Sequence, residues 1–123
     1  ISTLEAVKNS YNSYTMDSLA LAVGEASIRD EAYFRETCRK VAATRDRAAD
    51  ELRALGFEVT PSLANFLFAT HPKKAAPEIF SALREKGIFI RYFKLPRIDN
   101  HLRITVGTDE QMDALIAALK QIL

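Results

Sequence analysis

The sequence has few of the features that mark specialised protein classes. It has one cysteine, Cys38, among 123 residues, which excludes a disulfide framework and a cysteine pair spaced to hold a metal. No apolar run approaches the roughly 20 residues that a transmembrane helix needs. The 17 basic and 16 acidic residues leave a formal net charge of +1, which gives no general electrostatic reason to bind nucleic acid or a membrane. We therefore expect an ordinary globular domain without either partner, in a reducing compartment such as the cytoplasm.

Catalytic motifs are also missing. The sequence has no GxGxxG or Walker-type loop and no cluster of residues with metal-ligand spacing. His71 and His101 stand in expected loops, and we predict both to be surface side chains rather than ligands. Cys38 lies on the apolar face of an expected helix, and we predict it to be a small core residue rather than a nucleophile. The residues by themselves predict no catalytic and no metal-binding residue.

The spacing of apolar residues predicts helices followed by strands and further helices. Expected helices cover residues 16–28, 31–55, 76–87 and 108–123, and expected strands cover residues 57–61, 65–70, 88–93 and 102–107. This order predicts an α/β fold of the α+β kind, with an open, mixed or antiparallel sheet of about four strands and helices on one face.

Capping signals mark several helix ends. Asp30 has the position of an N-cap for the helix over 31–55, and Gly56 has the position of a glycine that ends it. Thr108 and Gln111 have the spacing of a capping box for the last helix. The apolar positions of that helix recur at intervals of three and four residues and predict a buried face: Met112, Leu115, Ile116, Leu119, Ile122 and Leu123.

Two arginines stand on neighbouring expected strands, in a stretch with a local excess of positive charge. Residues 84–103 carry six basic and two acidic side chains. Strand alternation places Arg103 on the face opposite Leu102, Ile104 and Val106, and it places Arg91 on one face with Phe89 and Phe93. The arginines either discourage edge pairing as exposed side chains or bind a small anionic partner, and periodicity alone leaves both interpretations open.

The last residues, "NHLRITVGTDEQMDALIAALKQIL", resemble the signature of histidinol-phosphate aminotransferases, which are pyridoxal-phosphate enzymes of the aspartate-aminotransferase fold, fold type I. Three further stretches are similar to segments of that family in the same order: "VKNSYNSYTMDSLALA", "PSLANFLF" and "LREKGIFIR". The resemblance implies that residues 31–123 form the small carboxy-terminal domain of such an enzyme. Residues 1–30 then link it to a large cofactor-binding domain before Ile1, and the opening "ISTLEAVKNSYNSY" also reads as the interior of a longer chain.

The resemblance assigns substrate-binding roles to five residues. Arg103 matches the arginine that faces the substrate's carboxylate, and Arg91 matches the arginine that binds the substrate phosphate. Tyr11, Asn12 and Asn65 match further positions near the substrate. A guanidinium group suits these roles because it stays protonated and donates two parallel hydrogen bonds to a carboxylate or phosphate.

The resemblance also implies what the chain lacks. The family's cofactor lysine and phosphate-binding turn have no match here, so no catalytic or cofactor-binding residue is expected, and the chain alone is predicted to be inactive. The whole enzyme is expected to use pyridoxal 5'-phosphate to transfer an amino group between glutamate and imidazole-acetol phosphate in histidine biosynthesis, with 2-oxoglutarate as the keto acid of glutamate. A cytoplasmic homodimer is expected.

Several alternatives remain open at this point. Tyr92 and Phe93 would suit an aromatic side chain of the substrate as well as an imidazole. The alternatives are therefore related enzymes that act on aromatic amino acids or on threonine phosphate, by amino transfer or by decarboxylation. A free-standing α/β domain that binds a metabolite or a partner protein is an alternative of another class.

Overall fold

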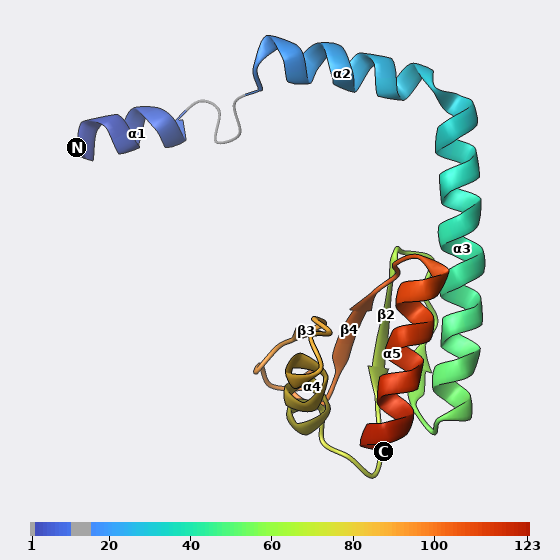
Figure 1. Cartoon of the computed structure of the whole chain (residues 1–123). Coiled ribbons are helices and arrows are strands. Elements are labelled where there is room, and N and C mark those ends of the chain that lie inside the picture. Colours follow the sequence, from blue (N-terminus) through green and yellow to red (C-terminus); the bar gives the residue numbers. More distant parts are fainter. Residues whose placement is uncertain (1, 11–15) are drawn as a thin grey trace. The chain divides into compact units, whose positions relative to one another are not determined.

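The computed structural model describes residues 2–10 and 16–123. Its elements are α1 (Ser2–Ser10), α2 (Ser18–Arg29), α3 (Glu31–Ala54), β1 (Glu58–Thr60), β2 (Phe66–Thr70), α4 (Ala76–Glu85), β3 (Arg91–Tyr92), β4 (Leu102–Thr105) and α5 (Asp109–Ile122) (Figure 1). The chain divides into two units, residues 1–36 and 37–123. The sequence predicted each of these elements except α1.

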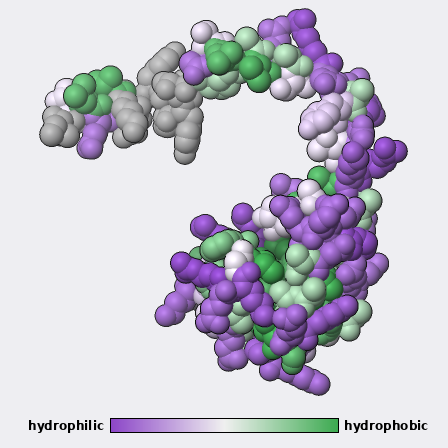
Figure 2. Space-filling model, in the orientation of Figure 1, coloured by the Kyte–Doolittle hydropathy of each residue, from purple (hydrophilic) through white to green (hydrophobic). Residues whose placement is uncertain are grey.

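The first unit contains α1, α2 and the start of α3. The Asp17 carboxylate caps α2 by accepting a hydrogen bond from the Ala20 N–H at 2.7 Å. No residue of α2 is buried, and Figure 2 shows its apolar side chains on the surface. An amphipathic helix usually buries its apolar face, so α2 presents a surface that its own unit does not cover.

The capping predictions for α3 are confirmed. The Asp30 carboxylate accepts a hydrogen bond from the Tyr33 N–H at 3.1 Å. At the other end Gly56 has a φ of 90°, and the Phe57 N–H donates to the Leu52 carbonyl at 3.0 Å. These features define a Schellman motif, in which glycine adopts the left-handed conformation at no steric cost.

The sheet has four strands in the order β1-β2-β4-β3, and every neighbouring pair is antiparallel. β3 is shorter than the predicted strand over residues 88–93, since only Arg91 and Tyr92 pair with β4. The end of α4 accounts for the first residue of the predicted strand. The Ile88 N–H donates to the Leu83 carbonyl at 2.9 Å in a second Schellman motif, at Gly87, so this amide is not available to the sheet.

The core lies on one face of the sheet, against α3, α4 and α5. Leu102 and Ile104 on β4 are each 1% exposed and Val106, directly after β4, is 9% exposed, so the predicted alternation is confirmed. The largest fully buried side chains are Leu52, Leu67, Ile79, Leu83, Leu102, Ile104 and Leu119. Arg103 therefore projects from the face opposite the core.

The last helix begins with the predicted capping box. The Thr108 hydroxyl accepts from the Gln111 N–H, and the Gln111 side-chain oxygen accepts from the Thr108 N–H at 3.0 Å. Four of the six predicted apolar positions are buried: Met112, Leu115, Ile116 and Leu119. Leu123 is 45% exposed, because it follows the last helical residue.

Arg47 on α3 ties this helix to α5. Its guanidinium donates to Asp113 at 2.6 Å, to Glu51 at 2.7 Å and to Asp109 at 2.9 Å, and the Thr44 hydroxyl donates to Asp109. The hydrogen bonds from Arg47 and Thr44 lower the pKa of Asp109. The same carboxylates raise the pKa of Arg47 further above its usual high value.

Two predictions about single residues are wrong. Cys38 is exposed, because the buried residues of α3 begin only at Thr44. His71 is 8% exposed rather than a surface side chain. Its ring packs edge-on against Phe57 with 5.0 Å between the ring centroids, and its Nδ1 accepts from the Lys73 N–H.

Candidate anion-binding site

Arg91 and Arg103 lie directly opposite each other in the sheet. β3 and β4 pair in a register in which the Cα atoms of Arg91 and Arg103 are partners. Directly opposed residues of an antiparallel pair project from the same face. The two arginines are therefore neighbours, on the face opposite the core.

Neither guanidinium has a carboxylate partner among the residues that the structure describes, whereas Arg47 donates to three carboxylates. In addition, Nε of Arg103 is buried and has no hydrogen-bond partner. Like charges directly opposite each other destabilise a strand pair, and a buried donor without an acceptor costs about 1–3 kcal/mol. Sites that break local rules of stability in this way are commonly functional.

Aromatic rings alternate with the two guanidinium groups. The Arg103 guanidinium carbon lies 5.1 Å from the ring centroid of Phe66 and 5.9 Å from that of Phe93. The Arg91 guanidinium carbon lies 5.2 Å from the same Phe93 centroid. We call these four side chains the arginine row. Tyr92 lies on the other face, where it packs against the core, so only Phe93 of the two predicted aromatic residues belongs to the row.

His101 also belongs to this face. Its ring stacks on Phe68, with 4.7 Å between the centroids and 9° between the planes, and Phe68 is the Cα partner of Arg103 on β2. His101 lies in a loop, as predicted, but it is half-buried rather than fully exposed, and its Nδ1 is buried without a hydrogen-bond partner. The strand alternation that puts Arg103 on this face, continued two positions back, would also have predicted this face for His101.

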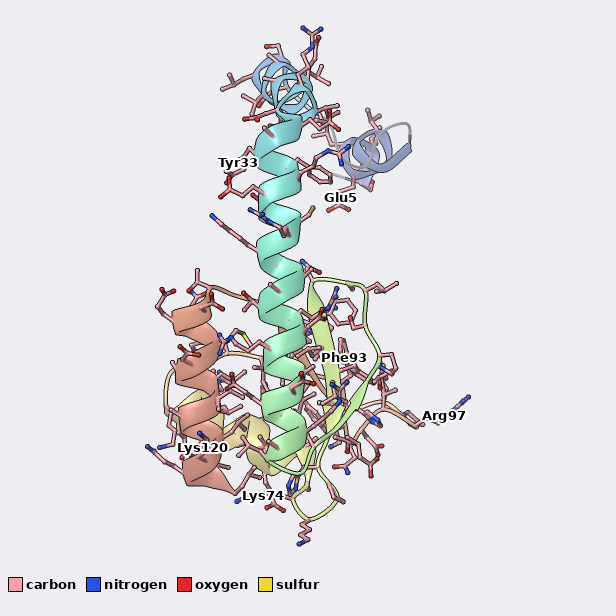
Figure 3. The ribbon with its side chains drawn as sticks, turned by 90° about the vertical axis from the view of Figure 1, so that its right-hand side faces the viewer. Glu5, Tyr33, Lys74, Phe93, Arg97 and Lys120 are labelled. Carbon is pink, nitrogen blue, oxygen red and sulfur yellow. The ribbon has the colours of Figure 1, made fainter. Side chains whose placement is uncertain are left out.

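The other basic residues nearby do not join the row. Lys94 and Arg97 are exposed residues of the loop between β3 and β4. Arg97 has a φ of 75°, and Figure 3 shows its side chain pointing away from the sheet.

Asn100 fixes the end of that loop. Its side-chain oxygen accepts from the Ala76 N–H at the start of α4 at 2.9 Å, and its side-chain nitrogen donates to the Thr70 hydroxyl at 3.2 Å. β4 thus starts from a point that is bonded to both β2 and α4, which supports the register of the two arginines.

No described contact joins the remaining predicted site residues to the arginine row. Tyr11 and Asn12 lie outside the described residues. Asn65 is exposed just before β2, and its carbonyl accepts from the Val106 N–H at 2.9 Å. Its neighbours across a surface pocket come from residues 37–45 of α3 and from Leu63. A substrate role for these three residues stays a prediction.

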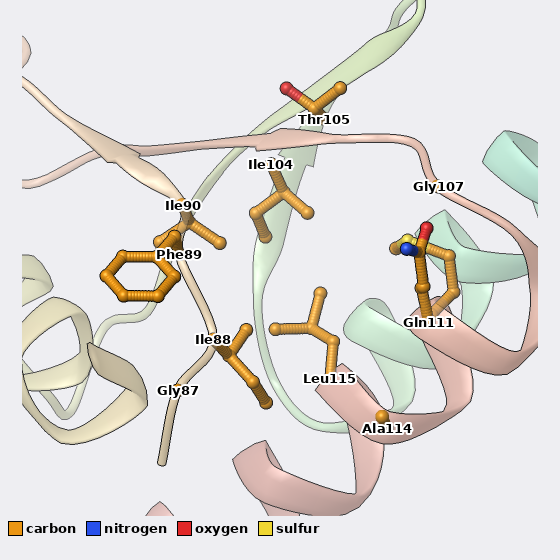
Figure 4. A pocket seen from close by; sticks show the side chains of 11 residues that line it. Gly87, Ile88, Phe89, Ile90, Ile104, Thr105, Gly107, Gln111, Ala114 and Leu115 are labelled. Carbon is orange, nitrogen blue, oxygen red and sulfur yellow. The ribbon is translucent and has the colours of Figure 1, made fainter. Parts of the chain in front are cut away.

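An apolar cavity of about 370 Å³ lies elsewhere in this unit, between residues 87–90, the end of β4 and α5 (Figure 4). No charged side chain lines it, so it is not suited to an anion. Among the described residues, the arginine row is therefore the site suited to bind an anion, and its four side chains include no nucleophile. No group of three or more potential metal ligands occurs among the described residues.

Comparison with known proteins gives matches over nearly the whole chain. The model of the family "Aminotransferase class I and II" matches residues 1–119. Histidinol-phosphate aminotransferase 2 of Dechloromonas aromatica is 56% identical over 122 residues, covering 99% of this chain and 34% of the relative. Histidinol-phosphate aminotransferase of Marinomonas sp. is 53% identical over 122 residues, covering 98% and 35%. The chain thus spans about a third of the length of these curated relatives.

Solved structures agree with the fold. The crystal structure of histidinol-phosphate aminotransferase from Sinorhizobium meliloti, in complex with pyridoxal-5'-phosphate, matches 98% of this chain and 34% of its own, with a TM-score of 0.82 and 30% identity. The enzyme of the same name from Clostridium acetobutylicum has a TM-score of 0.82 at 20% identity, which supports the fold alone. Among the described residues, no helix is long and apolar enough to cross a membrane.

Proposed function

The chain belongs to the class I and II aminotransferase family, and we propose that it is the substrate-binding domain of a histidinol-phosphate aminotransferase. The whole enzyme would transfer an amino group between glutamate and imidazole-acetol phosphate. One observation carries the proposal: Arg91 and Arg103 oppose each other in the sheet without a carboxylate partner among the described residues. The names of the similar proteins support the substrate.

Each arginine has its own role in this proposal. Arg103 holds the carboxylate end of glutamate or its equivalent in the second substrate, and Arg91 holds the phosphate. A guanidinium group can bind either anion through two parallel charge-assisted hydrogen bonds. Binding an anion also relieves the repulsion between the two positive charges, so the site is more stable when it is occupied. The arginines would further draw this domain onto the bound substrate and exclude water from the reaction.

Pyridoxal 5'-phosphate supplies the electron sink for amino transfer in this family. The resemblance matches no residue of this chain to the family's cofactor lysine, and two of the described lysines make other contacts. Lys74 donates to the Ile122 carbonyl at 2.6 Å and Lys86 donates to Gln121 at 2.8 Å, so both lysines serve the end of α5. The anion site of this chain likewise contains no lysine. We place the cofactor lysine in the part of the enzyme outside these 123 residues.

Further parts of the proposal rest on the family resemblance alone. They are a cytoplasmic homodimer, the large domain as intramolecular partner, and positions near the substrate for Tyr11, Asn12 and Asn65.

Single-turnover kinetics of the two half-reactions test the assignment. In the whole enzyme, Arg91→Ala should lower kcat/KM for the phosphorylated substrate by a factor that corresponds to about 2–5 kcal/mol of transition-state stabilisation, the range for truncating one partner of a desolvated ion pair. The glutamate half-reaction should change far less. Arg97→Ala is the matched control, because it removes one positive charge from the same stretch without touching the row.

The other outcomes separate the alternatives. Equal losses in both half-reactions would show that Arg91 does not select phosphate, and the histidinol-phosphate assignment would fail. A loss confined to unphosphorylated aromatic substrates would favour an aromatic aminotransferase. Turnover of a phosphorylated amino acid with release of carbon dioxide would favour the decarboxylase relatives.

A further inference from the structure

Phe93 is the one ring among the described residues that lies within cation–π distance of both arginines. Its centroid is 5.2 Å from the guanidinium carbon of Arg91 and 5.9 Å from that of Arg103. Phe66 reaches Arg103 alone. The register explains the difference. Phe93 comes one step beyond the Tyr92–Leu102 pair, which puts it on the face of both arginines and diagonal to Arg103.

We propose that Phe93 is a positioning residue that holds the two guanidinium groups in one geometry for an anionic substrate. This inference rests on the proposed function in one respect, since it takes Arg91 and Arg103 as the anion site. It assigns to Phe93 a role that requires no contact between this residue and the substrate.

The physical argument begins with the freedom of arginine side chains. Strand pairing fixes the two Cα atoms, but an arginine side chain carries about 2 kcal/mol of rotamer entropy, and like charges push the two groups apart. No ion pair within the described residues restrains either group. The Phe93 ring attracts both cations, so it opposes that separation and reduces the ordering that a substrate must impose.

The ring can do this without blocking the site. An aromatic ring attracts a cation to its face, while the N–H donors of a guanidinium lie in the guanidinium plane. An aspartate or glutamate in place of Phe93 would occupy those donors. An aromatic side chain therefore orders the arginines and leaves their hydrogen bonds for the substrate.

The test uses three variants of the whole enzyme. Phe93→Leu removes the aromatic face but keeps an apolar side chain, and Phe93→Tyr keeps the ring. Phe89→Leu is the matched control, because Phe89 is the other phenylalanine of the predicted strand, is 78% exposed and has no described contact with either arginine. Binding is measured by calorimetry with inorganic phosphate and with succinate as probes, beside KM, kcat and the thermal midpoint. Phe93→Met replaces the leucine variant if that variant does not fold.

Phe93→Leu should raise KM and weaken binding of both probes by roughly 5- to 30-fold, the range for two cation–π contacts. kcat and the thermal midpoint should change little, and Phe93→Tyr and Phe89→Leu should behave as wild type. The inference fails if Phe93→Leu binds normally, if tyrosine does not restore binding, or if kcat falls while KM stays constant. Failure of the proposed function has another signature, namely normal probe binding by Arg91→Ala and Arg103→Lys.

Discussion

Replacing Arg103 by lysine in the whole enzyme should impair substrate binding while leaving the fold intact. The substitution keeps the positive charge but loses the planar fork, so one ammonium group replaces two parallel donors. The Arg103 side chain makes no hydrogen bond and no ion pair with another described residue, so the substitution removes no described polar side-chain contact that stabilises the sheet.

The size of the effect follows from the contacts that are lost. One hydrogen bond to a charged group contributes about 1.5–3 kcal/mol, so losing one of two from the bidentate arrangement should reduce kcat/KM about 10- to 150-fold. Both half-reactions should suffer, because under the proposed function each substrate presents a carboxylate or its equivalent to Arg103. This distinguishes Arg103→Lys from Arg91→Ala, which is expected to act on the phosphorylated substrate.

Arg47→Met serves as the opposite control. Arg47 donates to Glu51, Asp109 and Asp113 and lies on the helix side of the sheet. Its replacement should lower the thermal midpoint and leave KM unchanged, whereas Arg103→Lys should raise KM and leave the midpoint unchanged. Stopped-flow kinetics and thermal unfolding of both variants give the comparison. A lowered midpoint together with normal KM for Arg103→Lys would refute the reasoning, since it would make Arg103 a structural residue.

Three further predictions concern the chain itself. Gly87→Ala should lower the free energy of unfolding by about 1–2 kcal/mol, because alanine is strained in the left-handed conformation. Gly56→Ala should lower it more, because the new Cβ would also lie 3.3 Å from Nε2 of His71. Equal losses for the two variants in urea denaturation would contradict this. Hydrogen bonds lower the pKa of Asp109. The contribution of its carboxylate to the stability of the fold is therefore complete at a pH above the ordinary pKa of aspartate, and it is lost as the pH falls below about 4. The difference in thermal midpoint between wild type and Asp109→Asn should shrink there, and a constant difference would count against it. Finally, the 123-residue chain should neither transaminate nor bind pyridoxal phosphate covalently; a labelled lysine after borohydride reduction and mass spectrometry would show otherwise.

Local signals predicted the helices and their ends well. The Asp30 and Thr108 caps and the glycine at 56 depend on hydrogen bonds within a few residues, so the sequence contains all that determines them. The side chains on the two faces of β4 were equally predictable, because side chains alternate between the faces within a single strand. Arg103 was placed correctly for that reason.

Relations between distant segments were harder to predict. Whether β3 and β4 pair with Arg91 opposite Arg103 depends on register, which no local pattern determines. The loss of Ile88 from the predicted strand depends on the use of its amide by α4. The burial of His71 depends on Phe57, on the far side of β1 and β2 in sequence. The alternation did place Phe93 beside Arg91, but the Phe66 contact with Arg103 came only from the pairing of β2 with β4.

The pairing of Arg91 with Arg103 depends on strand register and not on the number of residues between them. Residues 94–99 form an exposed or half-exposed loop, and Asn100 anchors its end. Insertions or deletions before Asn100 would change the separation in sequence and leave the separation in space unchanged. Loop length can therefore change while Arg91 and Arg103 remain opposite each other. A motif search with fixed spacing would miss such homologues, whereas an alignment of the two strands would find them.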